Sequence, residues 1–127
     1  MNILVDTNRY TDFAKGVSEV VDSFLSAELI FIPFIVLAEL RAGFRCGSMS
    51  LKNEMYLDRF LHNQKVRILF PDEGTTKVYA EVYSQLRRQG TPMPTNDIWI
   101  ASLAIQYSLP LYTRDKHFSN IPNLLCE

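Results

Sequence analysis

An aspartate directly follows the first apolar run of the chain. The run at 3–5 leads into Asp6, and Thr7 and Asn8 come next. Polar residues of these types favour turns and helix starts, so Asp6 taken alone is explained as a cap or a turn residue. A carboxylate at the carboxyl end of a buried strand can also form one wall of a ligand site. The positions of the other acids bear on which interpretation holds.

Two further aspartates stand in comparable places. Asp115 follows an apolar run at 110–113, just as Asp6 follows the first one. Asp97 lies in the first turn of a helix expected at 96–107, where free amide groups and the helix dipole favour an anion. Each has a structural alternative, since Asp115 suits a turn and Asp97 suits a helix dipole.

Glu39 is unusual among the acids because the residues around it are almost all apolar. It lies within PFIVLAELRAG, where an unpaired charge is costly to bury. Arg41 is a candidate partner for a purely structural ion pair. A helix that begins just after the second strand would instead carry Glu39 within two turns of the carboxyl edge of the sheet.

Carboxylates that converge on one crevice repel one another unless a cation lies between them. Cys46 and Cys126 are isolated, and no cysteine–histidine cluster is present, which argues against zinc. Oxygen ligands alone suit Mg²⁺ or Mn²⁺. These ions polarise phosphoryl groups and lower the pKa of bound water, which is phosphodiester chemistry.

Several basic residues lie close in sequence to these acids. They are candidates for holding substrate phosphates, although each also suits ordinary solvated surface: Arg9, Arg41, Arg45, Arg114 and Lys116. The chain has 13 lysines and arginines and 14 acids, a net charge of −1. If four acids surround a metal ion, ten remain against 13 bases, which leaves +3. We expect His117 to cap or line a loop, and Tyr79 and Tyr83 to pack in the core.

Alternating strand-like and helix-like stretches must position these residues. The pattern predicts an α/β fold with a parallel sheet covered on both faces. Strands are expected at 2–5, 29–32, 66–69 and 110–113, with a further edge strand at 124–125. Helices are expected at 9–15, 18–27 with Ser18 as cap, 33–45 with Pro33 in its first turn, 75–89 and 96–107. Ser50 opens one more, and its apolar side is expected to consist of Met55, Leu57, Phe60 and Leu61.

The length of 127 residues predicts one domain, and the hydrophobic content of 47% is enough for a core. The longest apolar stretch, 29–40, is broken by Pro33 and Glu39, so no membrane span is expected. Asp6 interrupts the first apolar run, so no signal peptide is expected either. The isolated cysteines fit a reducing compartment, and the cytoplasm is the expected location.

The chain resembles the PIN-domain ribonucleases, specifically the VapC-type toxins of bacterial toxin–antitoxin pairs. The resemblance rests on four segments in order, which span nearly the whole chain: ILVDTN, PFIVLAELRAG, TNDIWIASLA and LYTRDKHF. It implies that residues 1–127 form a single PIN domain, a three-layer α/β/α sandwich around a central parallel sheet.

The resemblance also implies a function and a site. The function is an endoribonuclease toxin that uses Mg²⁺ or Mn²⁺, leaves a 5′-phosphate and a 3′-hydroxyl, forms a homodimer and is inhibited by a VapB-type antitoxin. The residues that match the acidic quartet, as catalytic and metal ligands, are Asp6, Glu39, Asp97 and Asp115, and Asn8 and Thr113 match supporting polar positions. Some relatives carry a further acid where this chain has His117.

Two alternatives belong to other classes of protein. A haloacid-dehalogenase-like phosphatase also starts with an aspartate after its first strand, but its chemistry needs a second acid where this chain has Asn8. An inactive RNA-binding or scaffold protein on the PIN fold would be expected to lack at least one acid of the quartet, and all four are present here.

Overall fold

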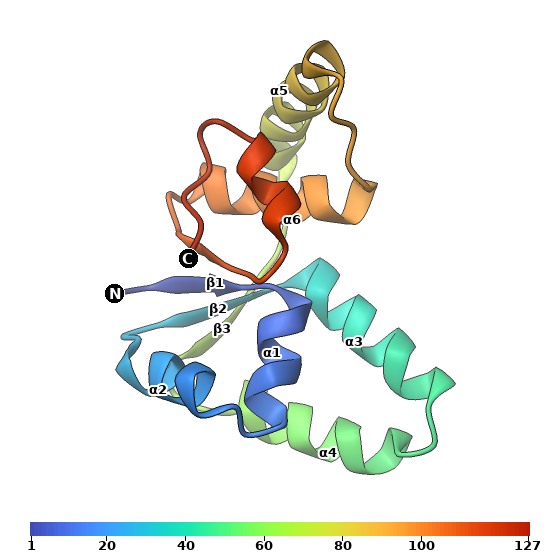
Figure 1. Ribbon diagram of the computed structural model, residues 1–127. Coiled ribbons are helices and arrows are strands. Elements are labelled where there is room, and N and C mark those ends of the chain that lie inside the picture. The colour runs from blue at the N-terminus through green and yellow to red at the C-terminus, as the bar shows by residue number, and fades with distance from the viewer.

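Four parallel strands form the sheet at the centre of the fold. The computed structural model describes all residues 1–127 (Figure 1). In chain order the elements are β1 (Ile3–Val5), α1 (Thr7–Ala14), α2 (Ser18–Ser26), β2 (Ile30–Pro33), α3 (Phe34–Cys46), α4 (Ser50–Leu61), β3 (Val66–Leu69), α5 (Glu73–Gln89), α6 (Thr95–Gln106), β4 (Leu111–Tyr112) and a 3₁₀-helix, η1 (Lys116–Asn120).

The order of the strands across the sheet is β3-β2-β1-β4. Ile3 pairs with Ile30 of β2, and Leu4 pairs with Leu111 of β4, so β1 lies inside the sheet. The chain extends the sheet from β1 through β2 to β3 and then crosses back to place β4 on the other side of β1. The carboxyl ends of β1 and β4 therefore meet at the point where the topology switches direction, which is where open α/β sheets bind ligands.

Helices cover both faces of the sheet. In Figure 1, α1, α2 and α4 lie on one side, α5, α6 and η1 lie on the other, and α3 leaves the carboxyl edge between them. The expected three-layer α/β/α sandwich with a central parallel sheet is confirmed.

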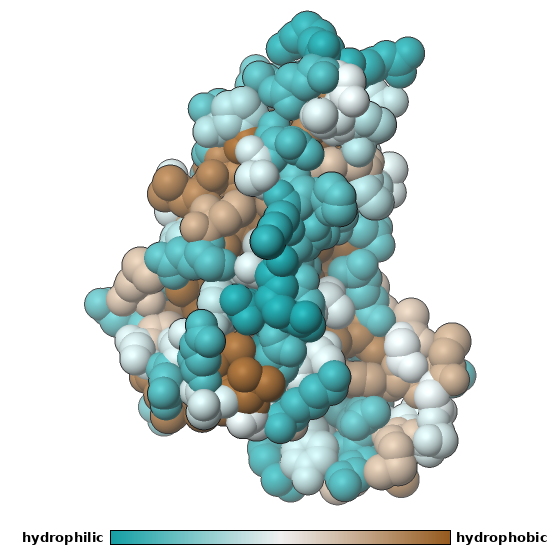
Figure 2. Space-filling view, in the orientation of Figure 1, coloured by the Kyte–Doolittle hydropathy of each residue, from teal (hydrophilic) through white to brown (hydrophobic).

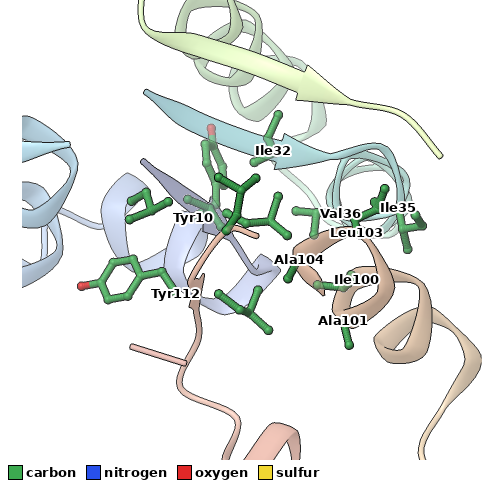
Figure 3. Packing of buried hydrophobic residues seen from close by; sticks show 14 of the residues in the cluster. Tyr10, Ile32, Ile35, Val36, Ile100, Ala101, Leu103, Ala104 and Tyr112 are labelled. Atoms are coloured by element: carbon green, nitrogen blue, oxygen red, sulfur yellow. The ribbon is translucent and has the colours of Figure 1, made fainter. Parts of the chain in front are cut away.

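The core lies on both faces of the sheet, and α6 contributes the largest number of its buried residues among the helices. All residues of β1 are buried, as a strand covered on both faces requires. Helix α6 is buried on nearly all sides, and Figure 3 shows its Ile100, Leu103 and Ala104 packed near Val36 of α3 and Ile32 of β2. The packing of α6 against α3 places the first turn of α6 and the middle of α3 at the same edge of the sheet.

Several predicted boundaries are wrong by a few residues, and helix caps are the main reason. Helix α1 begins at Thr7 rather than 9, because Asp6 is its N-cap. Helix α5 begins at Glu73 rather than 75, because Asp72 and Thr75 form a capping box. Ser18 is the first residue of α2 and not its cap, which is Val17 with no side-chain hydrogen bond.

Two strand expectations also change. Pro33 is the last residue of β2 and precedes α3, because its extended backbone suits a strand end. The predicted edge strand at 124–125 is reduced to one parallel bridge between Leu111 and Cys126. Hydrogen bonds from Leu111 N–H to Leu125 O and from Glu127 N–H to Leu111 O, both 2.8 Å, hold this end of the chain beside β4.

One residue of the predicted apolar side of α4 lies outside the core. Leu57 is fully buried and Phe60 and Leu61 pack against the core, whereas Met55 is 57% exposed. Of the two tyrosines of α5, Tyr79 packs against the core beside Trp99 as expected, but Tyr83 is 46% exposed. None of the helices combines the length and the apolar character needed to cross a membrane.

Candidate active site

Asp6 is the most buried of the four acids, with 6% of its surface exposed. Its Oδ1 accepts a hydrogen bond of 2.8 Å from the Thr7 N–H, which caps α1. Its Oδ2 accepts 2.7 Å from the Thr113 hydroxyl and 3.2 Å from the Asn8 side-chain amide. Asp6 is thus a helix cap and is also held by two side chains, so the cap interpretation alone does not account for its environment.

Asn8 and Thr113 connect the start of α1 to the loop after β4. The Asn8 Oδ1 accepts a hydrogen bond of 3.0 Å from the Arg114 N–H. The Thr113 hydroxyl accepts 3.0 Å from the Asp115 N–H while it donates to Asp6. These bonds place Asp115 and Asp6 at the same edge of the sheet, on the two strands that flank the switch point.

Glu39 reaches this edge from the second turn of α3. Its Oε1 accepts a hydrogen bond of 2.7 Å from the Thr7 hydroxyl, 32 residues earlier in the chain. The alternative pairing with Arg41 is wrong, because Arg41 faces α4 and lies 3.4 Å from Glu54 and 3.5 Å from Asp58. Glu39 therefore has no cationic partner within the protein.

Asp97 joins the group from the first turn of α6. Its pKa is raised to about 6, chiefly by partial burial and then by the charges of Asp6, Asp115 and Glu39, while His117 acts in the opposite direction. Burial also raises the pKa of Asp6, against the hydrogen bonds from Thr113 and Thr7, with further contributions from Glu39 and Asp115. The four carboxylates thus act on one another electrostatically, although they come from four separate elements.

His117 occupies the outer side of this group. Its N–H and its Nδ1 lie 2.9 and 2.8 Å from Asp115 Oδ1, and Asp115 caps η1 through the first of these contacts. The side chain of His117 is 81% exposed. The expectation that His117 caps or lines a loop is confirmed.

The donor set suits a divalent cation that prefers oxygen. Four carboxylates, none of them paired with a lysine or an arginine, match Mg²⁺ or Mn²⁺ in ligand type. As the side chains lie, no three of the His, Cys, Asp or Glu residues are grouped closely enough to hold an ion. Any cation bound here would therefore draw the carboxylates together, and it would offset the mutual repulsion that contributes to the raised pKa of Asp97.

Comparison with known proteins bears directly on this arrangement. A model of the PIN domain matches residues 3–124. The chain belongs to the PIN-domain family.

The relatives that this PIN domain resembles include VapC ribonucleases and a VapBC complex of known structure. Ribonuclease VapC1 of Haemophilus influenzae strain R2866 is 30% identical over 129 residues, which cover 98% of this chain and 95% of the relative. Ribonuclease VapC2 of Rickettsia felis is 36% identical over 99 residues, or 77% of this chain and 72% of the relative. The structure of VapBC2 from Rickettsia felis bound to a DNA fragment from its promoter superposes with a TM-score of 0.89 and 30% identity, covering 100% of this chain and 98% of that one.

The basic residues of this PIN domain differ in how freely they can meet a substrate. Arg41 is occupied by α4, as described, whereas Arg45 and Lys116 are exposed and have no partner. The side chain of Arg9 is only 18% exposed and lies over the ring of Tyr112, 4.6 Å from its centroid. The side chain of Arg114 is 54% exposed.

Sequence reasoning missed Asp12, which pairs with two of these arginines. Its Oδ2 lies 2.8 Å from Arg114 Nε and 3.4 Å from Arg9 Nη1. A local signal existed, because Arg9 and Asp12 are three residues apart on a helix and hence on one face. No pattern in the sequence indicated that Asp12 pairs with Arg114, which is more than 100 residues away in the chain.

Proposed function

We propose that this PIN-domain protein is an endoribonuclease toxin that hydrolyses RNA phosphodiester bonds with Mg²⁺ or Mn²⁺ and is inhibited by a VapB-type antitoxin. The observation that carries the proposal is the meeting of four acids at one edge of the sheet, where hydrogen bonds hold Asp6, Asp115 and Glu39 and where their charges, together with burial, raise the pKa of Asp97. The names of the VapC ribonucleases, which this chain matches over most of its length, support it.

In this proposal Asp6, Glu39, Asp97 and Asp115 hold the cation. The ion supplies Lewis acidity toward a phosphoryl oxygen and lowers the pKa of water. Thr113 and Asn8 hold Asp6 by donating to one of its oxygens, and Thr7 holds Glu39 in the same way. For Asp6, the hydrogen bond from Thr113 opposes the rise in pKa that burial causes, and the ionised carboxylate is the form that binds a cation.

The proposal includes a protein partner and a second copy of the chain. A groove of about 470 Å³ lies between α1, α3 and α4, and Met49 and Tyr56 line it although both are at least half exposed. Figure 2 shows hydrophobic residues that reach the surface beside a hydrophilic band. Such exposed apolar side chains support a toxin that is covered by its antitoxin and that forms a homodimer. The two free cysteines fit a location in the cytoplasm.

Cleavage of RNA by the purified protein tests the proposal. Freed of any partner, the wild type is expected to cut a structured RNA in millimolar Mg²⁺ or Mn²⁺ and to stop in EDTA. Asp97→Asn is expected to lose about 100-fold or more in rate, because it removes a charge that holds the ion. The matched control is Asp22→Asn, an exposed aspartate on α2, which keeps the wild-type rate. Cleavage that persists unchanged in Asp97→Asn would show a contaminating nuclease.

A further inference from the structure

Asp12 is a buried carboxylate outside the group of four acids. It lies in the second turn of α1, with 9% of its surface exposed. A carboxylate buried to this extent needs compensation by cations or donors. One oxygen, Oδ2, faces both Arg114 at 2.8 Å and Arg9 at 3.4 Å. Asp12 therefore joins α1 to the loop that carries Thr113 and Asp115.

The two arginines are held differently. Arg9 is largely buried against Tyr112, and its Nε is buried without a hydrogen-bond partner. Arg114 gives only its Nε to Asp12, and its two terminal amino groups have no partner within the protein. Because the side chain of Arg114 is more than half exposed, these two groups are free to meet a ligand from solvent, and the next residue in the chain is Asp115.

The local charge also favours an anion. Two guanidinium groups face one carboxylate, so the cluster of Arg9, Asp12 and Arg114 keeps a net positive charge. The backbone N–H of Arg114 is fixed by Asn8 at 3.0 Å, next to the group that holds Asp6. A guanidinium whose inner nitrogen is anchored presents its terminal pair in a fixed plane, the geometry that matches phosphate oxygens.

We propose that Asp12 is a positioning residue: it fixes Arg114 so that the terminal amino groups of Arg114 contact a phosphate of the RNA strand beside the scissile bond. This inference rests on the proposed ribonuclease function. It separates Arg114 from the other four basic candidates, and it gives Arg9 a structural role in neutralising Asp12.

The first test compares the kinetics of RNA cleavage by wild type, Asp12→Asn, Arg114→Ala and the double variant. We expect Asp12→Asn and Arg114→Ala each to raise KM about tenfold with a smaller effect on kcat, because a flanking phosphate is bound equally in the ground and transition states. The double variant is expected to match Arg114→Ala, since Asp12 acts through Arg114. The control Arg88→Ala, an exposed arginine on α5, keeps the wild-type KM.

The salt dependence of kcat/KM distinguishes a phosphate contact by Arg114 from a purely structural role, because a structural role would leave that dependence unchanged. Loss of one phosphate contact lowers the slope of log(kcat/KM) against log[salt] by about 0.7 for a single strand. If Asp12 acted only as a negative charge near the site, Asp12→Asn would instead bind RNA more tightly. Wild-type KM and slope in Arg114→Ala overturn the inference, even where Asp12→Asn fails to fold.

A measurement of RNA binding tests this inference independently of the proposed ribonuclease activity. Fluorescence anisotropy of a labelled single-stranded RNA gives Kd in the Asp97→Asn background, where cleavage is lost. Arg114→Ala and Asp12→Asn are each expected to raise Kd about tenfold there. An RNA that wild type binds but does not cut contradicts the nuclease, and the same comparison of Kd values then decides the role of Asp12. Kd values unchanged by both substitutions overturn the inference alone.

Discussion

The pKa of Asp97 depends on the acidic side chains around it as well as on its place in the helix. Helix dipoles stabilise an ionised carboxylate in the first turn, so this position alone would lower its pKa. Its pKa is instead raised to about 6 from 3.8, by burial and then by Asp6, Asp115 and Glu39. Burial and repulsion together outweigh the helix dipole, so Asp97 opposes folding when it is ionised and no cation is present.

At the residue scale this sign gives a test with pH. The folded pKa lies above the unfolded value, so the cost of Asp97 is absent below about pH 4 and complete above about pH 6. After discounting for partial exposure, that cost is about 1 to 2 kcal/mol. In EDTA at pH 7.5, Asp97→Asn is therefore expected to melt about 5 °C above wild type, and the gap is expected to close near pH 4.

Millimolar Mn²⁺ should narrow or reverse this ranking in the same thermal melts. Ligand binding stabilises the state that binds, and Asn cannot supply the lost charge. Asp22→Asn, the exposed control, should follow wild type in both buffers. An Asp97→Asn protein that is less stable than wild type in EDTA, and that responds equally to Mn²⁺, would make Asp97 a helix-dipole partner only.

At the scale of elements, long-range side-chain contacts hold helices to the sheet. Lys65, just before β3, donates through Nζ to the carbonyls of Phe24, Leu25 and Ala27 at 2.6, 3.0 and 3.0 Å. These carbonyls lie at the end of α2, where the helix leaves its last acceptors without partners. A cation at this end also matches the helix dipole. Lys65 therefore links the end of α2 to β3, the edge strand of the sheet.

Replacement of Lys65 separates the stability of the fold from the chemistry of the site. Lys65→Met keeps the apolar stem and removes the donors, so we expect a loss of about 1 to 3 kcal/mol in the free energy of unfolding. Lys77→Met on α5, an exposed lysine without a partner, should lose less than about 0.5 kcal/mol. Urea titration measures both. At 25 °C the folded Lys65→Met protein should cut RNA as wild type does, and a loss of cleavage would contradict the separation.

At the scale of the whole molecule, the charge is nearly balanced but unevenly placed. The net charge is −1, yet four of the acids act on one another at a single edge of the sheet. The rest of the surface is accordingly more basic than the total suggests. Exposed apolar residues of α4 and its N-cap, such as Met55 and Met49, add a surface suited to a protein partner.

Expression in a bacterial host tests the molecule as a whole. The chain expressed alone is expected to arrest growth, and a co-encoded antitoxin is expected to relieve the arrest. Asp6→Ala should remove toxicity at an equal level of protein, because Asp6 is proposed to hold the cation. Asp22→Ala should remain toxic. Plating after induction measures these outcomes, and equal toxicity of Asp6→Ala and wild type would reject catalysis as the cause.

The sequence by itself determined the order of strands and helices and the family. Strand ends and helix starts depend on local periodicity and turn residues, so Asp6 and Asp115 were predicted at strand ends from the sequence alone. The four acids were named as one group from motifs, and their role as metal ligands stays a prediction, as do the extent of the single domain, the homodimer and the location in the cell.

Only the tertiary structure decided which charges meet. Asp12 pairs with Arg114 across more than 100 residues, and Arg41 turns away from Glu39 toward α4. Met55 was predicted on an apolar face, but no element packs over it. Ion pairs and burial depend on how separate elements are brought together in space, and side-chain chemistry at one position does not encode which distant element will face it.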